Sequence, residues 1–140
     1  MYRYRCKVLR VVDGDTVDVD IDLGFGVWMH RERVRIMGID TPESRTRDLV
    51  EKQFGLAAKE YVKSLMPVGS MQIIKTQKDK TGKFGRILGD FELEGGMFTE
   101  IMINNHHAVA YNGQNKEDVK ESHLRNRAIL IENGSIKLKE

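Results

Sequence analysis

The chain has 140 residues, which fits one domain with its own core but is too short for two domains of ordinary size. Hydrophobic residues make up 40% and charged residues 31%, as in soluble globular proteins, and no apolar run approaches the length that a membrane span needs. A net charge of +2 is too small to indicate nucleic-acid binding by itself, so the distribution of charge has to decide that question.

The first residues, 1–6, lack the apolar core of a secretory signal. If Met1 is the natural start, we therefore expect a protein that stays in the cytoplasm, or in the host cytoplasm if the chain is viral. We also expect no membrane partner and a monomer. Cys6 is the single cysteine, so no intramolecular disulfide can form. Its place in a strand-like run favours a buried structural thiol over a reactive one.

The first third of the chain predicts three strands. Aliphatic residues alternate with Thr and Asp over 16–23, which puts the aliphatic side chains on a buried face and the acids on the other. Asp13-Gly14 predicts a tight hairpin turn between this strand and one over 6–12. A third strand, from about Val27 to Ile39, is long enough to bend around a barrel.

The rest of the chain alternates helical and extended patterns. Apolar residues over 50–66 fall on one helical face, and Pro67 with Gly69 ends that pattern. The remaining segments are strands over 71–77 and 86–93 and helices over 99–104 and 117–132, while 135–140 has no clear pattern. This order predicts one α+β domain over 1–140 and is compatible with a five-stranded OB-fold barrel with three helices, although the pattern alone leaves other small α+β domains open.

Acidic and basic residues gather where these strands end. Asp15 and Asp40 each close an apolar run, so both could reach one rim of a barrel with the Thr41 main-chain carbonyl, and oxygen ligands of this kind suit Ca²⁺ or Mg²⁺. Arg35 and Arg86 could hold a phosphate through paired hydrogen bonds. Ordinary turn chemistry and surface charge remain the alternative for each of these residues taken alone.

Two further features bear on nucleic-acid chemistry. Glu43 could accept the proton of a water that attacks phosphorus, or it could be a loop acid paired with a nearby arginine. Between Lys75 and Arg86 there are five basic residues and one acid, which predicts either a solvated hairpin loop or a loop that contacts phosphate.

Five motifs occur in one order: VVDGDTV, RVRIMGIDTPE, KFGR, AVAY ending at Tyr111, and His-Leu-Arg from His123. Together they resemble the staphylococcal nuclease (thermonuclease) family, from about Lys7 to about Arg127. The resemblance implies the five-stranded OB-type barrel and a Ca²⁺-dependent endonuclease that hydrolyses single-stranded or locally open DNA and RNA and leaves 3′-phosphate ends. Mg²⁺ is the less favoured ion.

The resemblance also implies residue roles. The metal ligands would be Asp15, Asp40 and Thr41; the catalytic residues Arg35, Glu43 and Arg86; and the substrate-binding residues Lys83, Phe84 and Tyr111. Phe84 replaces the family's tyrosine and so lacks a hydroxyl, and Gly113 stands where a second tyrosine is expected. A barrel that binds nucleic acid or protein without catalysis is the competing hypothesis, and the intact acids and arginines argue against it.

Overall fold

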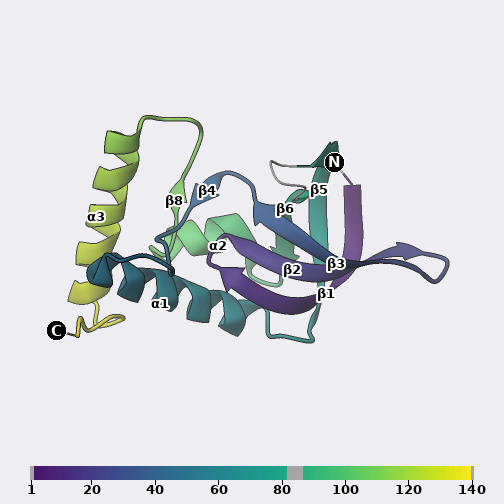
Figure 1. Ribbon diagram of the computed structural model, residues 1–140, viewed down its shortest axis with the longest axis horizontal. Helices are drawn as coiled ribbons and strands as arrows, with labels where there is room; N and C mark the ends of the chain where they lie inside the picture. Colours follow the sequence, from purple (N-terminus) through teal and green to yellow (C-terminus); the bar gives the residue numbers. More distant parts are fainter. Residues whose placement is uncertain (1, 82–86, 140) are drawn as a thin grey trace.

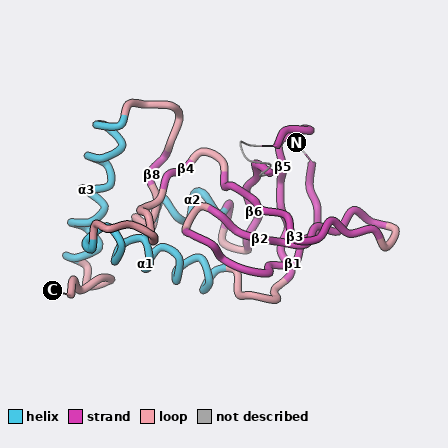
Figure 2. Tube along the Cα trace, viewed as in Figure 1, coloured by secondary structure: helices cyan, strands magenta, loops and turns pink. Residues whose placement is uncertain are grey.

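Five long strands form a curved antiparallel sheet that closes on itself (Figures 1 and 2). The computed structural model describes residues 2–81 and 87–139. The strands are β1 (Tyr2–Asp13), β2 (Thr16–Gly24), β3 (Val27–Ile36), β5 (Met71–Thr81) and β6 (Ile87–Leu93), and the two-residue β7 (Gly96–Met97) extends the edge. The sheet order is β3-β2-β1-β5-β6-β7, and a parallel pairing of β3 with β6 closes the barrel. The predicted α+β OB-type class is confirmed.

Within the described residues, three helices cover one side and one end of the barrel. They are α1 (Leu49–Leu65), α2 (Phe98–Asn104) and α3 (Lys116–Glu132), each close to its predicted range. In Figure 1, α1 lies along the lower side of the barrel, whereas α3 stands at the end opposite the projecting β2–β3 hairpin. In the part of the chain that is described, no helix is long and apolar enough to cross a membrane.

The third strand ends earlier than the sequence predicts. β3 stops at Ile36, a turn follows in which Gly38 has a φ of +77°, and the chain continues as the short β4 (Ile39–Asp40). β4 pairs with β8 (Val109–Ala110) in a separate two-stranded sheet. Because of this break, Asp40 leaves the barrel wall and lies between the barrel and α3.

The hydrophobic core fills the barrel and the space between the barrel and α1. Cys6, Val8, Val19 and Ile74 are fully buried inside it, and Ala58 and Val62 of α1 pack onto them. Burial raises the pKa of the Cys6 thiol to about 12, so the predicted structural thiol is confirmed. The segment with no clear pattern contributes Ile136, which packs with Phe54 and Leu130 in a second cluster.

His107 makes the stability of this fold depend on pH. The ring is buried, it stacks on Tyr61 with centroids 4.6 Å apart, and burial, followed by the nearby His106, lowers its pKa. The unfolded chain therefore binds a proton at His107 at a higher pH than the folded chain does, and protonation favours unfolding.

We expect the free energy of unfolding to decrease as pH falls from about 6.5, the usual histidine value, toward the lowered pKa of His107. His107→Phe keeps an aromatic ring against Tyr61 and should flatten this dependence in urea titrations at several pH values. His30→Gln changes a histidine whose side chain is 69% exposed and should keep most of the wild-type slope. An unchanged slope in His107→Phe would assign the effect to another group.

Candidate active site

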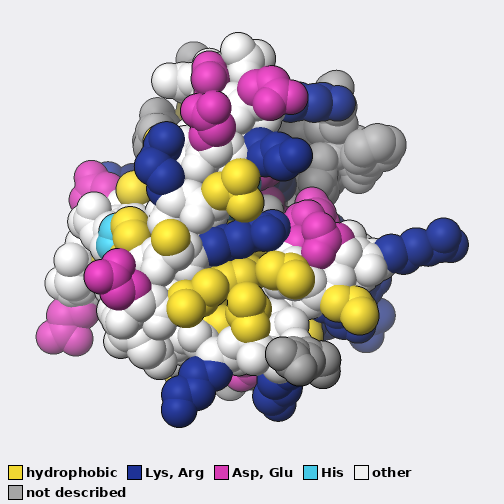
Figure 3. Space-filling view, turned by 90° about the vertical axis from the view of Figure 1, so that its left-hand side faces the viewer, with side chains coloured by type: hydrophobic (Ala, Val, Ile, Leu, Met, Phe, Trp, Pro, Cys, Tyr) yellow, Lys and Arg dark blue, Asp and Glu magenta, His cyan; other side chains and the backbone are white. Residues whose placement is uncertain are grey.

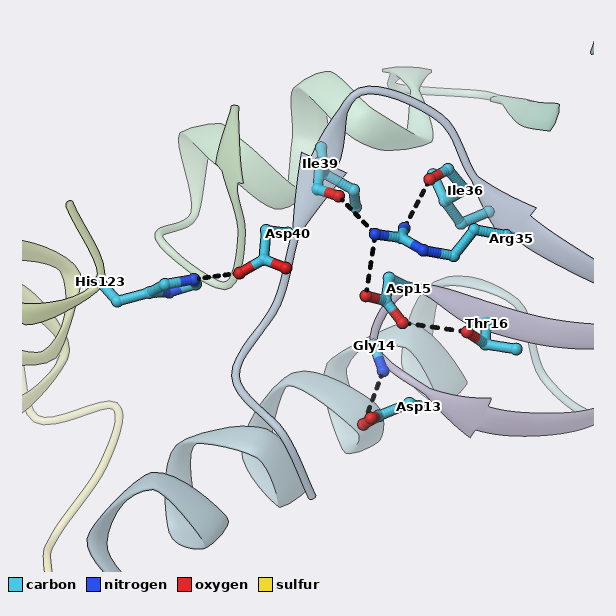
Figure 4. Close-up of polar contacts among 9 residues, drawn as sticks. All are labelled: Asp13, Gly14, Asp15, Thr16, Arg35, Ile36, Ile39, Asp40 and His123. Atoms are coloured by element: carbon cyan, nitrogen blue, oxygen red, sulfur yellow. Dashed lines mark hydrogen bonds and ion pairs between the residues drawn. The ribbon is translucent and has the colours of Figure 1, made fainter. Parts of the chain in front are cut away.

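Arg35 lies where the barrel closes. On β3 it is paired with Thr16 of β2 on one side and with Leu88 of β6 on the other. Its guanidinium donates through Nη1 to the Ile36 carbonyl at 2.6 Å and through Nη2 to the Ile39 carbonyl at 3.0 Å (Figure 4). The side chain thus spans the break between β3 and β4, where two hydrogen bonds hold it with 21% of its surface exposed.

Asp15 reaches the same guanidinium from the β1–β2 hairpin turn. Its Oδ2 lies 3.4 Å from Arg35 Nη2, and its Oδ1 accepts a hydrogen bond from the Thr16 hydroxyl at 3.0 Å. The Asp15 carbonyl also accepts from the backbone N–H of Ile36 at 2.9 Å. The turn predicted at Asp13-Gly14 therefore places Asp15 against the end of β3.

Asp40 is contacted from the other side by α3. His123 Nε2 lies 2.7 Å from Asp40 Oδ2, and Figure 4 shows the His123 ring pointing at this carboxylate from the side away from Arg35. The next residue, Thr41, is buried with 3% exposure, and among the described residues its hydroxyl has no hydrogen-bond partner.

Glu43 belongs to the loop that joins β4 to α1. Its backbone N–H donates to Glu51 Oε2 at 3.0 Å, and Gly55 of α1 packs directly beneath its carbonyl. The residue reaches the surface, yet partial burial raises the pKa of its carboxyl, followed by the negative charges of Asp13, Asp15 and Asp40. Glu43 is therefore a carboxyl group whose proton affinity lies above that of a free glutamate.

Two cavities open on these side chains. The smaller, of about 470 Å³, is lined by Val12, Asp13, Asp15, Thr16, Arg33, Arg35, Asp40 and Glu43. The larger, of about 890 Å³, separates the β4–α1 loop from α3, and its walls include Tyr111 and His123. Arg35, Asp40 and Glu43 line both cavities.

The residues that line the smaller cavity have the chemistry to bind a hard divalent cation. Asp15, Asp40 and Glu43 supply carboxylate oxygens, which such ions prefer. The pKa of Glu43 is raised first by partial burial and then by the neighbouring negative charges, and a cation would offset those charges. Within residues 2–81 and 87–139, no three His, Cys, Asp or Glu side chains are close enough to hold an ion as they stand. His123 contacts Asp40 through Oδ2, whereas both carboxylate oxygens of Asp15 have partners, Oδ2 in Arg35 and Oδ1 in Thr16.

The structure thus brings together Asp15, Arg35, Asp40, Thr41, Glu43 and Tyr111 of the predicted set. Lys83, Phe84 and Arg86 lie outside the described residues, and their roles stay predictions. Sequence reasoning missed that His123 contacts Asp40 and that Lys116 and Lys120 line the larger cavity. Their spacing of three and four residues was the available signal, since it puts them on one face of a helix.

Comparisons with known proteins identify a family and several relatives of this chain. The sequence model of a family described as "Staphylococcal nuclease homologue" matches residues 33–129, a range that includes Arg35, Asp40 and Glu43 but not Asp15. The chain is 32% identical over 96 residues to a thermonuclease of Staphylococcus hyicus, covering 67% of this chain and 52% of that protein.

Two other relatives are endonucleases by description. An uncharacterized endonuclease of Escherichia coli is 30% identical over 114 residues, covering 81% of this chain and 65% of that one. Endonuclease YhcR of Bacillus subtilis is 26% identical over 114 residues, covering 77% of this chain and 9% of that protein. The chain therefore spans only part of each of these relatives, from about a tenth to about two thirds of their length.

Proposed function

Because the chain belongs to the staphylococcal nuclease family, we propose that it is a Ca²⁺-dependent nuclease. Its substrates would be single-stranded or locally open DNA and RNA, which it would cleave to leave 3′-phosphate ends. One observation carries the proposal: Arg35, Asp40 and Glu43 come from a strand end, a short strand and a loop, and all three line both cavities. These are the groups that phosphodiester hydrolysis needs beside one another.

Asp15, Asp40 and the main-chain carbonyl of Thr41 would hold the cation. The cation would supply Lewis-acid polarisation of a phosphoryl oxygen. In the structure, Asp15 faces Arg35 at 3.4 Å and Asp40 faces His123 at 2.7 Å, so each carboxylate is oriented by a neighbour that can donate a hydrogen bond. His123 would thereby restrict the rotation of Asp40, as partners of metal-binding side chains do in other sites.

Arg35 would stabilise charge on the phosphate. A guanidinium keeps its charge at all relevant pH values and has five N–H donors, so it can hold Ile36 and Ile39 carbonyls and still present an N–H to the cavity. As water adds to phosphorus, charge grows on the nonbridging oxygens, and a fixed donor stabilises that change. Arg86 would be the second such donor.

Glu43 would accept the proton of the attacking water. The pKa of the Glu43 carboxyl is raised toward neutral pH. A base with such a pKa is still ionised at neutral pH and accepts a proton more readily than a free glutamate does. The water oxygen would bond to phosphorus as the bond to the 5′-oxygen breaks, and the 5′-oxygen would leave with the bonding electrons. The phosphate would remain on the 3′-side of the cleaved chain.

Lys83, Phe84 and Tyr111 would bind the nucleotide. Tyr111 is 46% exposed beside the larger cavity, which leaves a ring face open for stacking on a base. Phe84 would retain ring packing without a hydroxyl for the phosphate. Because Gly113 stands in place of a second tyrosine, more of the binding affinity for the nucleotide would depend on other side chains.

A binding module of the same fold is the second candidate function. It is favoured by the pairing of Asp15 with Arg35 and of Asp40 with His123, which leaves the described carboxylates short of a ready-made metal site. Such a module would bind nucleic acid or protein without cleaving a phosphodiester. The two candidates therefore differ in turnover, not in affinity.

A fluorescent single-stranded oligonucleotide distinguishes the candidates. We expect cleavage with Ca²⁺, little with Mg²⁺ and none in excess chelator, and end-group analysis should find 3′-phosphates. Ca²⁺ with a nucleotide should also raise the thermal unfolding temperature, because both would bind only the folded state. Cleavage that persists in excess chelator would contradict the metal site, and tight binding without cleavage would support the module.

A further inference from the structure

Helix α3 is attached to the rest of the molecule mainly through its second half. Asn126 Nδ2 donates to the Ala108 carbonyl at 3.2 Å, the Arg127 guanidinium lies 5.3 Å from the centre of the Phe54 ring, and Leu130 is the helix residue that is buried. In the described chain, hydrogen bonds and ion pairs from α3 side chains to other elements begin at His123. The first two turns of α3 therefore line the larger cavity without side-chain hydrogen bonds or ion pairs to other described elements.

Charge is sorted around α3. The helix residues that line the cavity follow one stripe of three- and four-residue steps: Lys116, Val119, Lys120, His123, Leu124 and Arg127. The stripe holds three of the helix's four basic residues and none of its four acidic ones, Glu117, Asp118, Glu121 and Glu132. Figure 3 faces the end of the molecule at which α3 stands and shows basic, acidic and hydrophobic side chains there, with a basic side chain beside hydrophobic ones at the centre of the view.

The opposite wall of the same cavity has the opposite charge. Among the residues that the structure describes, it carries the carboxylates of Asp40, Glu43, Asp48 and Glu51 and one cation, Arg35. A nucleic-acid backbone in the cavity would be repelled by that wall and attracted by Lys116 and Lys120, which are both exposed. Two exposed apolar side chains, Tyr111 at 46% and Leu124 at 47%, offer contacts for unstacked bases.

We propose that the cleft between α3 and the barrel holds a single nucleic-acid strand, with Lys116 and Lys120 binding the backbone phosphates next to the scissile one. The inference rests on the proposed function for the position of the scissile phosphate near Arg35. Lys120 and Lys116 lie about 5 Å and about 10 Å along the helix axis from His123, which contacts Asp40. The two lysines therefore extend the site away from the reacting centre in two steps.

The test compares substrates of different length. In the double variant Lys116→Gln/Lys120→Gln, kcat/KM for a single-stranded decanucleotide should fall about tenfold, because each lost phosphate contact weakens binding. For a dinucleotide, whose only internucleotide phosphate is the scissile one, kcat/KM should stay within about twofold of the wild-type value. Fluorescence anisotropy with Ca²⁺ would measure the association constant for the decanucleotide at several salt concentrations. The slope of the logarithm of this constant against the logarithm of the salt concentration should decrease in magnitude by about 1.4, because each phosphate contact with a single strand contributes about 0.7.

A matched control lies on the same helix. Arg125→Gln removes one positive charge, half the change in the double variant, from an exposed residue that does not line the cavity, and it should leave kcat/KM for both substrates and the salt slope near wild type. Lys116→Arg/Lys120→Arg keeps the charge and should retain decanucleotide binding. The inference is wrong if the glutamine variant loses activity equally on both substrates, or if decanucleotide binding and its salt slope are unchanged.

The binding measurement also separates the two proposals. A wild-type protein that binds the decanucleotide without cleaving it would contradict the nuclease activity, while the salt slopes of the variants would still decide the role of α3. A wild-type protein that cleaves normally, with the same length dependence in all variants, would leave the nuclease proposal standing and reject the role of Lys116 and Lys120.

Discussion

Arg35→Lys should lower turnover of single-stranded DNA by at least about 100-fold, the scale seen when one preorganised transition-state donor is removed. The Arg35 guanidinium bridges the Ile36 and Ile39 carbonyls through two different nitrogens and also faces Asp15. A lysine has one nitrogen, so it cannot span both carbonyls and still direct a donor into the cavity. Initial rates with Ca²⁺, together with thermal unfolding of the variant, measure the effect.

Arg3→Lys is the control for this substitution. Arg3 makes a paired contact with Glu92, through Nε at 3.1 Å and Nη2 at 2.6 Å, on an exposed part of the barrel that lines neither cavity of the candidate site. The same chemical change there should alter turnover less than about twofold, because exposed ion pairs contribute little. A folded Arg35→Lys enzyme with near wild-type turnover would remove Arg35 from the chemical step.

Gly55→Ala should lower turnover by about 100-fold, because a displacement of about 1 Å in a reacting group can have that effect. A Cβ at Gly55 would lie 2.3 Å from the Glu43 carbonyl oxygen and 2.6 Å from the Ser44 nitrogen, both backbone atoms that cannot turn aside. Alanine favours the helix by up to about 1 kcal/mol, so α1 should persist and the loop should move. Steady-state kinetics measures the loss, and circular dichroism checks that α1 persists.

Gly95→Ala provides the comparison. Its Cβ would have one neighbour, Ile101 Cδ1 at an ordinary 3.8 Å, and Gly95 is not among the residues with positive φ. This variant should match wild type in turnover and fold. A fully active Gly55→Ala would show that the position of the Glu43 loop does not limit the rate, and Glu43→Gln would then be needed to test the side chain by itself.

Local patterns predicted most of the fold. Alternation over 16–23 places β2 within one residue of its observed end, and the helix predicted over 117–132 is observed over 116–132. The break after Ile36 was not predictable in this way, because it depends on the parallel closure of β3 onto β6 and on the Arg35 bridge across the turn. Both are contacts made only by the folded barrel.

In the candidate site, too, local motifs predicted some residues, whereas contacts that depend on the folded structure were not predictable. The motifs predicted that Asp15, Arg35, Asp40 and Glu43 belong together, and the structure gathers them around adjoining cavities. The contact of His123 with Asp40 joins residues 83 positions apart, so it depends on where α3 packs and not on any local pattern. Arg86 stays a prediction, because the described residues do not include it.

The small β4–β8 sheet joins a proposed ion-binding residue to a proposed nucleotide-binding residue. Ile39 and Asp40 pair with Ala110 and Val109, and the Tyr111 N–H donates to the Gly38 carbonyl at 2.9 Å. The Asp40 carboxylate, proposed to bind the ion, and the Tyr111 ring, proposed to stack on the base, are therefore connected by one short hydrogen-bonded ladder, and we expect them to move together. Changes that loosen this ladder should weaken ion affinity and nucleotide affinity in proportion, a correlation that independent loops would not produce.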